Sequence, residues 1–394
     1  MPILEKTEAN RGASLSGEEI TRLMRLWIGW GLVRTIVVIA GWLAALRALT
    51  LASRWYIAAD LSRSHLPRAR RLGKLRRMKT TLARLVVLLG LSLVAASARA
   101  QMGDPTKVTL KTTPVAGSIS MIEGANGFAG GNVAASVGDD GVVVIDDELQ
   151  PLTPKLKAAL AALSKKPVRF VINTHWHMDH TGGNPAMAAA GAVIVAQENV
   201  RKRLSVDNVM HMAGHEMTIK ALPPAALPVV TFADDVTLHV NGDDVHVIHV
   251  APAHTDGDSI VHFKLANVIH AGDTVTASYP IVDIDSGGQF EGFIAAGDRI
   301  LALADDNTKI IPGHGPLMTK ADLVVYRQML IDVRDRIGKL MAAKKTVDEI
   351  KATKPLADLD ARWGQGFVNA DRLIESVVKT HPPAPEKGHA KAKK

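Results

Sequence analysis

Four residues of the types that bind metal ions fall within a stretch of six, in the run His175-Trp176-His177-Met178-Asp179-His180. Imidazole and carboxylate groups are suitable ligands for zinc, iron or manganese. In a tight loop, residues two apart can converge on one ion, so we expect His175 and His177 to share a metal while Asp179 and His180 face a second one. Without a cation, such crowding would desolvate polar groups with nothing to compensate them. The run therefore predicts a metal site.

Three further candidate ligands lie in later loops at the ends of apolar stretches. They are His254 in Ala253-His254-Thr255-Asp256-Gly257, Asp273 in Gly272-Asp273-Thr274, and His314 in Ile311-Pro312-Gly313-His314-Gly315-Pro316. Loops of this kind commonly hold functional sites. Other histidines lie in or beside expected strands and are assigned no role: His239, His246, His249, His262 and His270.

The His-x-His-x-Asp-His run and the three later residues, in this order, resemble the signature of the metallo-β-lactamase superfamily, over roughly residues 106–320. The resemblance implies an α/β fold, an αββα sandwich of two mixed β-sheets flanked by helices, here with extra C-terminal helices. It also implies two Zn²⁺ ions per chain. The first would be held by His175, His177 and His254, the second by Asp179, His180 and His314, and Asp273 would bridge both.

The sequence departs from many true β-lactamases of this superfamily at the bridging position. Those enzymes use cysteine or serine there, and some place a lysine three residues later, whereas this chain has Asp273 and Thr276. In this respect it is similar to glyoxalase II, lactonases and exported members of the family. β-Lactam hydrolysis stays possible without being required.

The function expected from the resemblance is zinc-dependent hydrolysis of a small-molecule substrate. A hydroxide bridging two metals would attack an amide, ester or thioester carbonyl, with β-lactams and lactones among the candidates. Asp179 would be a ligand and would also orient the hydroxide. One alternative is a mononuclear iron persulfide dioxygenase with its iron on His175, His254 and Asp273. Another is a non-catalytic metal-binding protein.

The elements that position these residues are short strands and helices after residue 106. We expect strands at residues 118–123, 133–137, 142–145, 168–173, 192–196, 236–240, 245–250, 259–265, 267–270 and 309–311. Helices are expected at residues 152–164, after Gly182-Gly183-Asn184, and at 292–304 and 320–342, with shorter helical pieces beyond residue 345. Asp139-Asp140-Gly141 and Asn241-Gly242 predict hairpin turns, because these residue types tolerate positive φ. The mixture predicts an α/β fold with helices covering mixed sheets.

Several residues near the predicted site have two open interpretations. Asp146, Asp147 and Asp258 are either acceptors for the outer ring N–H of a ligand histidine or solvated carboxylates. The segment around Met210-His211-Met212 and His215 is expected to be an irregular surface loop, with a roof over the site as the alternative. Tyr279 either borders the pocket and donates to an oxyanion or has no such role. Specificity is expected from residues 124–131, 204–222 and 279–288.

The charge of the chain is unevenly distributed. Residues 1–100 carry 17 of the 47 Lys and Arg residues and 5 of the 39 Asp and Glu residues, so residues 101–394 have a net charge of −4. This part of the chain has no charge footprint for nucleic acid. Cysteine is absent, which excludes disulfides, thiolate ligands and a cysteine nucleophile.

The N-terminal hundred residues contain two apolar stretches. Residues 78–100 resemble a secretory signal peptide, with Lys79 and Arg84 before an apolar run and Ala98-Arg99-Ala100 before Gln101. Residues 27–46 are long enough to cross a bilayer but contain Arg34. Either translation begins at Met78 and residues 1–77 are an over-extended reading frame, which we favour, or residues 27–46 form a membrane helix. Both interpretations place the domain outside the cytoplasm, in the periplasm or secreted, with membrane contact only through this N-terminal segment.

The expected organisation is thus an N-terminal extension at residues 1–77, a signal-like segment at 78–100, the metallo-β-lactamase domain at 101–320, C-terminal helices at 321–380, and a disordered basic tail at 381–394.

Overall fold

A computed structural model describes Arg47 and residues 107–212 and 215–381 of the chain. The chain divides into two compact units, Met1–Val94 and Ala95–Lys394, and the fold below is that of the second. The expected membrane helix, the signal-like segment and the tail beyond residue 381 lie outside the described residues. Among the residues described, no helix is both long and apolar enough to cross a lipid bilayer.

The first large sheet has seven strands in the order β1-β2-β3-β4-β5-β6-β9. The pairs from β4 to β9 are parallel and the others antiparallel, so the sheet is mixed. Its strands are β1 (Thr109–Ala116), β2 (Ile119–Ala125), β3 (Val133–Gly138), β4 (Gly141–Ile145), β5 (Val168–Asn173), β6 (Val193–Gln197) and β9 (Val230–Phe232).

The second large sheet has six strands in sequence order, with one parallel pair between β13 and β14. Its strands are β10 (Asp235–Val240), β11 (Asp243–His249), β12 (Ser259–Phe263), β13 (Val268–His270), β14 (Lys309–Ile311) and β15 (Met318–Thr319). Asn241 and Gly242 both have positive φ between β10 and β11, as a two-residue hairpin turn requires.

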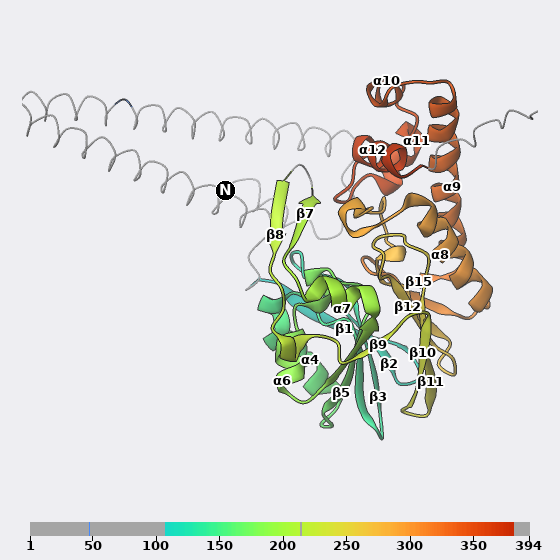
Figure 1. Cartoon of the computed structure of the whole chain (residues 1–394). Coiled ribbons are helices and arrows are strands. Elements are labelled where there is room, and N and C mark those ends of the chain that lie inside the picture. The colour runs from blue at the N-terminus through green and yellow to red at the C-terminus, as the bar shows by residue number, and fades with distance from the viewer. Residues whose placement is uncertain (1–46, 48–106, 213–214, 382–394) are drawn as a thin grey trace, which may run out of the picture. The chain divides into compact units, whose positions relative to one another are not determined.

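Three hydrophobic clusters define the layers of the fold. One contains residues of both large sheets, among them Val143 and Val247, and is the core between them. A second packs the outer face of the first sheet against α4 (Thr153–Leu163) and α6 (Asn184–Ala189). A third packs the outer face of the second sheet against the later helices. The αββα sandwich expected from the sequence is therefore confirmed (Figure 1).

The C-terminal helices share the core of the second sheet. They are α8 (Phe290–Leu303), α9 (Lys320–Ala342), α10 (Val347–Ala352), α11 (Ala357–Trp363) and α12 (Ala370–Thr380). Helix α9 begins with a capping box, because Thr319 accepts from the backbone N–H of Asp322 while the Asp322 carboxylate accepts from the backbone N–H of Thr319. Burial of Leu373 and Val377 attaches α12 to the cluster that contains Ile260 and Ile269 of the second sheet.

Two local expectations were wrong. The expected irregular segment around Met210 is a two-stranded antiparallel sheet of β7 (Asn208–Met212) and β8 (His215–Ile219), which follows α7 (Glu198–Leu204) and projects beyond it (Figure 1). Asp179 and His180 lie on the short helix α5 (Met178–Thr181) rather than in an extended loop. In the first case, the alternation of Met217 and Ile219 with exposed Glu216 and Thr218 is a strand pattern that our prediction from the sequence missed.

Candidate metal centre

The structure brings all seven predicted ligand residues together. His175 and His177 lie between β5 and α5, and Asp179 and His180 lie on α5. The other three residues follow strands of the second sheet: His254 after β11, Asp273 in the 3-10 turn Gly272–Thr274 after β13, and His314 after β14. The site therefore sits where strand ends of both sheets meet.

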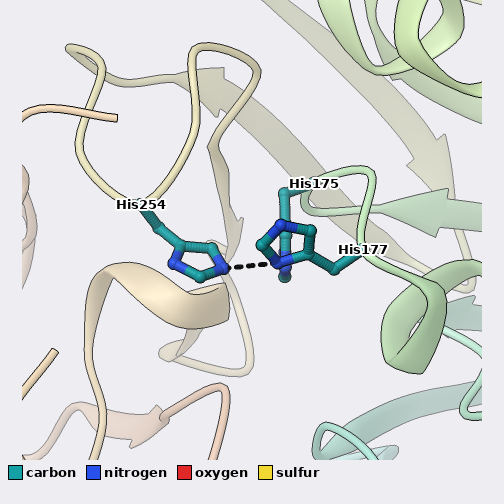
Figure 2. Close-up of side chains that lie close together, drawn as sticks. All are labelled: His175, His177 and His254. Carbon is teal, nitrogen blue, oxygen red and sulfur yellow. Dashed lines mark hydrogen bonds between the residues drawn. The ribbon is translucent and has the colours of Figure 1, made fainter. Parts of the chain in front are cut away.

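His175, His177 and His254 form a first cluster, in which one ring nitrogen of each lies within 4.8 Å of the others. Nε2 of His254 is 2.7 Å from Nδ1 of His177, and the ring of His175 faces both (Figure 2). The outer nitrogens of this pair are occupied: Nε2 of His177 donates to Asp283, and Nδ1 of His254 donates to the carbonyl of Ile281. In their neutral forms both rings therefore direct a lone pair inward, as metal ligands do.

Asp179, His180 and His314 form a second cluster. Oδ2 of Asp179 lies 3.4 Å from Nε2 of His314 and 3.7 Å from Nε2 of His180. Asp273 lies between the two clusters, because its oxygens are 3.2 Å from His180, 3.4 Å from His314 and 3.5 Å from His254. This is the position that a bridging carboxylate would need.

Buried atoms without partners show that these residues fit metal ions. Within the part of the chain that the structure describes, Nε2 of His175, Nε2 of His180 and Oδ1 of Asp273 are buried without a hydrogen bond, although the last two lie 3.2 Å apart. Leaving such groups unpaired is costly, and a cation is the partner that would satisfy imidazole lone pairs and a carboxylate at once. The donor set, imidazole and carboxylate only, suits zinc.

The electrostatics separate the two clusters. Burial and then His177 lower the pKa of His254 to about 4, and burial also lowers the pKa of His175. Burial opposes the charged form of His314, but the carboxylates of Asp273 and Asp179 raise its pKa to about 10. Although burial works against ionisation, His180 and His314 hold the pKa of Asp179 well below its usual range. His175 and His254 of the first cluster are thus held in their neutral forms, whereas the second cluster is a set of mixed charges.

Hydrogen bonds from behind orient the ligand rings. Oδ2 of Asp146 lies 2.7 Å from Nδ1 of His180, so its interpretation as an acceptor for a ligand ring is confirmed. Asp147 instead accepts from the backbone N–H of Gly183, and Asp258 accepts from the backbone of His254 and Thr255. Neither of these two carboxylates contacts a ligand ring by a hydrogen bond, although both are buried rather than solvated.

The sequence did not identify Asp283 as a site residue. It lies in the expected specificity segment 279–288, and its Oδ2 is 2.8 Å from Nε2 of His177. Burial opposes its ionisation, but the hydrogen bond from His177 lowers the pKa of Asp283 to about 2. The sequence alone shows Asp283 only as an aspartate in a loop, and such aspartates are common outside functional sites.

Two glycines allow the close packing of the site. A Cβ atom on Gly131 would lie 2.1 Å from Cε1 of His180, and one on Gly313 would lie 2.0 Å from Oδ1 of Asp273. Asn132 then holds the loop of His314, since its side chain donates to the carbonyls of Pro312 and Gly315. Any side chain at either glycine would displace a ligand.

A cavity of about 510 Å³ adjoins the segment that supports the first cluster. Its wall includes Ile281, whose carbonyl accepts from His254, and Ile284 and Asp285 of the same segment. Two of the three expected specificity segments line the cavity: residues 279–288, and residues 204–222 through His211 of β7. The remaining wall consists of residues of α12 and of the residues just before this helix. From the third, Phe128 stacks on His314 and contacts the cavity residue Phe367, with ring centroids 5.9 Å apart in both pairs.

Tyr279 does not border the site. Its side chain is buried, and its hydroxyl donates to Oδ1 of Asp360 at 3.0 Å. The interpretation of Tyr279 as an oxyanion donor was therefore wrong, because the C-terminal helices bind the hydroxyl. His270, to which no role was assigned, is also buried and lies 2.9 Å from the carbonyl of Asn132, a structural contact.

Comparison with known proteins agrees with this geometry. A family model described as the metallo-beta-lactamase superfamily matches residues 127–314. A hydroxyacylglutathione hydrolase from Erythrobacter litoralis is 28% identical over 216 residues, which cover 50% of this chain and 74% of that protein. The alpha subunit of a 2,4-dinitroanisole O-demethylase from Nocardioides sp. is 25% identical over 181 residues, and the match spans 45% of this chain and 50% of that protein.

Among solved structures, a stereoselective inverting sec-alkylsulfatase from Pseudomonas sp. is similar in fold, with a TM-score of 0.52 and 16% identity. The match covers 72% of this chain and 52% of that one, so the chain spans about half of the alkylsulfatase. From its fold, the convergence of these seven residues and the family match, the part of the chain at residues 127–314 is a metallo-β-lactamase-superfamily domain, and the similarity to curated relatives supports a hydrolase.

Proposed function

We propose that this hydrolase uses two divalent metal ions, zinc in the native protein, to open an amide, ester or thioester carbonyl of a small-molecule substrate. The observation that carries the proposal is the arrangement of His177 and His254. Their outer nitrogens are both occupied, and their inner nitrogens lie 2.7 Å apart. Two neutral rings in these tautomers would repel each other, so the pair needs a proton or a cation between them.

The residues divide between two metal positions. His175, His177 and His254 would hold the first ion, Asp179, His180 and His314 the second, and Asp273 both. Two such ions supply an activated water at neutral pH and polarise a carbonyl oxygen. Three imidazoles within reach of one another favour zinc over the alternative iron site on His175, His254 and Asp273.

Asp179 would orient the attacking water. Its side chain is 17% exposed and that of His314 is 29% exposed, whereas His175 and His180 are completely buried. Substrate therefore approaches from the side of Asp179 and His314. A carboxylate at this opening can accept a hydrogen bond from water and align it for attack.

The cavity beside the first cluster would bind the part of the substrate that does not react. Ile281, Ile284 and Phe367 offer apolar contact, and Arg372 and Lys379 add two positive charges from α12. Asp285 pairs with His211 of the same wall, Glu375 pairs with Lys351 of α10, and Arg372 also donates to the carbonyl of Phe367. This lining suits a substrate with an apolar body and an anionic group.

We also propose that the domain acts outside the cytoplasm, in the periplasm or secreted. The support is the signal-like sequence at residues 78–100. N-terminal sequencing of the mature protein tests it, and a start far from Gln101 would contradict cleavage at Ala100.

The test of function is metal content and turnover of the purified full-length protein. Elemental analysis should find two zinc ions per chain, and the same sample should hydrolyse at least one of a penicillin, a carbapenem, a lactone and a glutathione thioester. One iron per chain without hydrolysis would overturn the proposal in favour of a persulfide dioxygenase. Bound zinc without turnover of any of these substrates would favour the non-catalytic metal-binding alternative.

A further inference from the structure

Three consecutive carboxylic acids, Asp146, Asp147 and Glu148, follow β4 and are completely buried. Both oxygens of Asp146 accept hydrogen bonds from Thr174, and Oδ2 also contacts His180. One oxygen of Asp147 accepts from Gly183. Both carboxyl oxygens of Glu148 have no hydrogen-bond partner among the described residues. A buried carboxyl group without a partner is unfavourable, so its retention needs a reason.

The backbone holds Glu148 in a conformation that L-residues rarely adopt. Its φ is 70°, and Asp146, two residues earlier, has φ 60°. The carbonyl of Glu148 accepts from Gly182, and the N–H of Asp147 donates to the carbonyl of His180. The acidic segment is therefore tied to α5 and the residue that follows it, and α5 carries two ligands of the second cluster.

The carboxyl group of Glu148 lies directly behind this cluster. A Cβ atom built on Gly130 would lie 2.8 Å from Oε2 of Glu148, 2.8 Å from the carbonyl oxygen of Asp179 and 3.3 Å from its Cβ. Only a glycine thus separates Glu148 from Asp179. Burial raises the pKa of Glu148 to about 9, while His180 and His314 lower it and Asp179 and the adjacent Asp147 raise it. Three of these four charged groups belong to the second cluster.

We propose that Glu148 is a positioning residue for the second metal ion, whose buried carboxylate strengthens the binding of the cation held by Asp179, His180 and His314. Without the cation, burial keeps this unpartnered group in its neutral acid form, and a cation bound at the second position would stabilise its ionised form. The resulting negative charge would in turn strengthen the binding of the cation. The inference rests on the two-metal function proposed above. It assigns to Glu148 no contact with substrate.

The test is Glu148→Gln in the full-length, metal-free protein, titrated with zinc against a chromophoric chelator. The amide keeps the shape and removes the charge. Mutation of a group that supports metal ligands typically lowers metal affinity about 10–100-fold. We therefore expect the second zinc equivalent to bind about tenfold more weakly to the variant. The first equivalent should keep its affinity. The Tm of the metal-free variant should stay close to that of the unmodified protein, because a neutral amide replaces a neutral acid of the same shape.

Two further variants make the result specific. Glu123→Gln removes a carboxylate from β2 that pairs with Lys111 on the surface, and it should leave both zinc affinities unchanged. Glu148→Asp keeps the charge while shortening the side chain, so it should retain most of the second affinity and keeps the inference testable if the glutamine variant fails to fold.

Unchanged affinity for both equivalents in Glu148→Gln would overturn the inference. So would a parallel loss of both affinities together with a lower Tm, which is the signature of a purely structural role. If the unmodified protein binds no second zinc ion, the two-metal function itself fails, and that outcome is distinguishable because it precedes any comparison of variants.

Discussion

Asp283 lies 106 residues after His177 in the chain, yet its Oδ2 atom is 2.8 Å from Nε2 of that histidine. The contact leaves Nδ1 of His177 as the nitrogen that faces His254. The carboxylate therefore selects the tautomer and the orientation of a ligand ring, in the manner of carboxylate–histidine–zinc sites.

Replacing Asp283 should weaken the first metal position selectively. In Asp283→Asn the amide cannot stabilise the ring as a carboxylate does, and we expect a loss of about 10–100-fold in affinity for the first zinc equivalent. Asp285→Asn, on the same segment but paired with His211 at the surface, is the matched control. Equal affinities in both variants would refute the role assigned to Asp283.

Asp179→Ala should separate catalysis from folding. Loss of a positioned acid–base group typically costs about 10²–10⁴-fold in rate, and we expect kcat to fall within this range. The side chain is partly exposed and has no packing role in the core clusters, so the circular dichroism spectrum should be unchanged. A fully active Asp179→Ala would contradict the proposed mechanism.

Zinc affinity of the second position should increase with pH. The pKa of His314 in the metal-free protein is about 10, above the ordinary value of 6.5, so the ring carries a proton at neutral pH. Its charged form stabilises the metal-free fold fully below pH 6.5, and this contribution is lost as the pH rises through 10. Zinc must displace the proton, so affinity should rise by at least about tenfold per pH unit between pH 7 and pH 9.

Competitive zinc titrations at pH 7, 8 and 9 check this dependence, and the Tm of the metal-free protein should fall over the same interval. The pKa of His254 is about 4, so the first zinc equivalent serves as the internal control and should respond much less. Identical slopes for the two equivalents would show that His314 is not the group displaced.

Gly131→Ala should damage the second position by steric overlap. The added methyl group would lie 2.1 Å from the ring of His180, which is buried and cannot move freely. Overpacking of this kind costs about 1–3 kcal/mol, measurable as a loss in the free energy of unfolding. Gly297→Ala on helix α8 is the control, because the nearest atom to its added methyl group would be 3.6 Å away, on Arg327 of α9. Within a helix, alanine is about 0.5–1 kcal/mol more favourable than glycine. Similar effects of the two changes would argue against close packing at Gly131.

Arg372→Ala and Lys379→Ala should raise KM for anionic substrates while changing kcat little. The two residues line the cavity beside the first cluster but lie on α12, away from the ligand residues. Loss of one charged contact is worth about 1.4 kcal/mol, or tenfold in KM. A neutral analogue of the same substrate is the control. If its KM rises equally, the two side chains do not recognise the anionic group.

Local sequence determined the parts of this protein that depend on neighbouring residues. The run from His175 to His180 places four ligand groups within one short segment wherever that segment lies. The turn at Asn241 and Gly242 follows from the positive φ that these residues tolerate, and the apolar run of β5 predicts a buried strand. The αββα arrangement and the order of the later ligands came from resemblance of the whole pattern rather than from any single segment.

Tertiary structure alone decided which distant side chains became partners. An aspartate in a loop has the same sequence signature whether it supports a ligand, as Asp283 does, or pairs at the surface, as Asp285 does. The hydroxyl of Tyr279 donates to Asp360 and not to a group of the site. Residues of α12 line the cavity, and α12 lies there because it packs in the same hydrophobic cluster as the second sheet. Contacts between segments far apart in the chain depend on how the two sheets and the C-terminal helices bury their apolar faces, and local residue type does not encode that pairing.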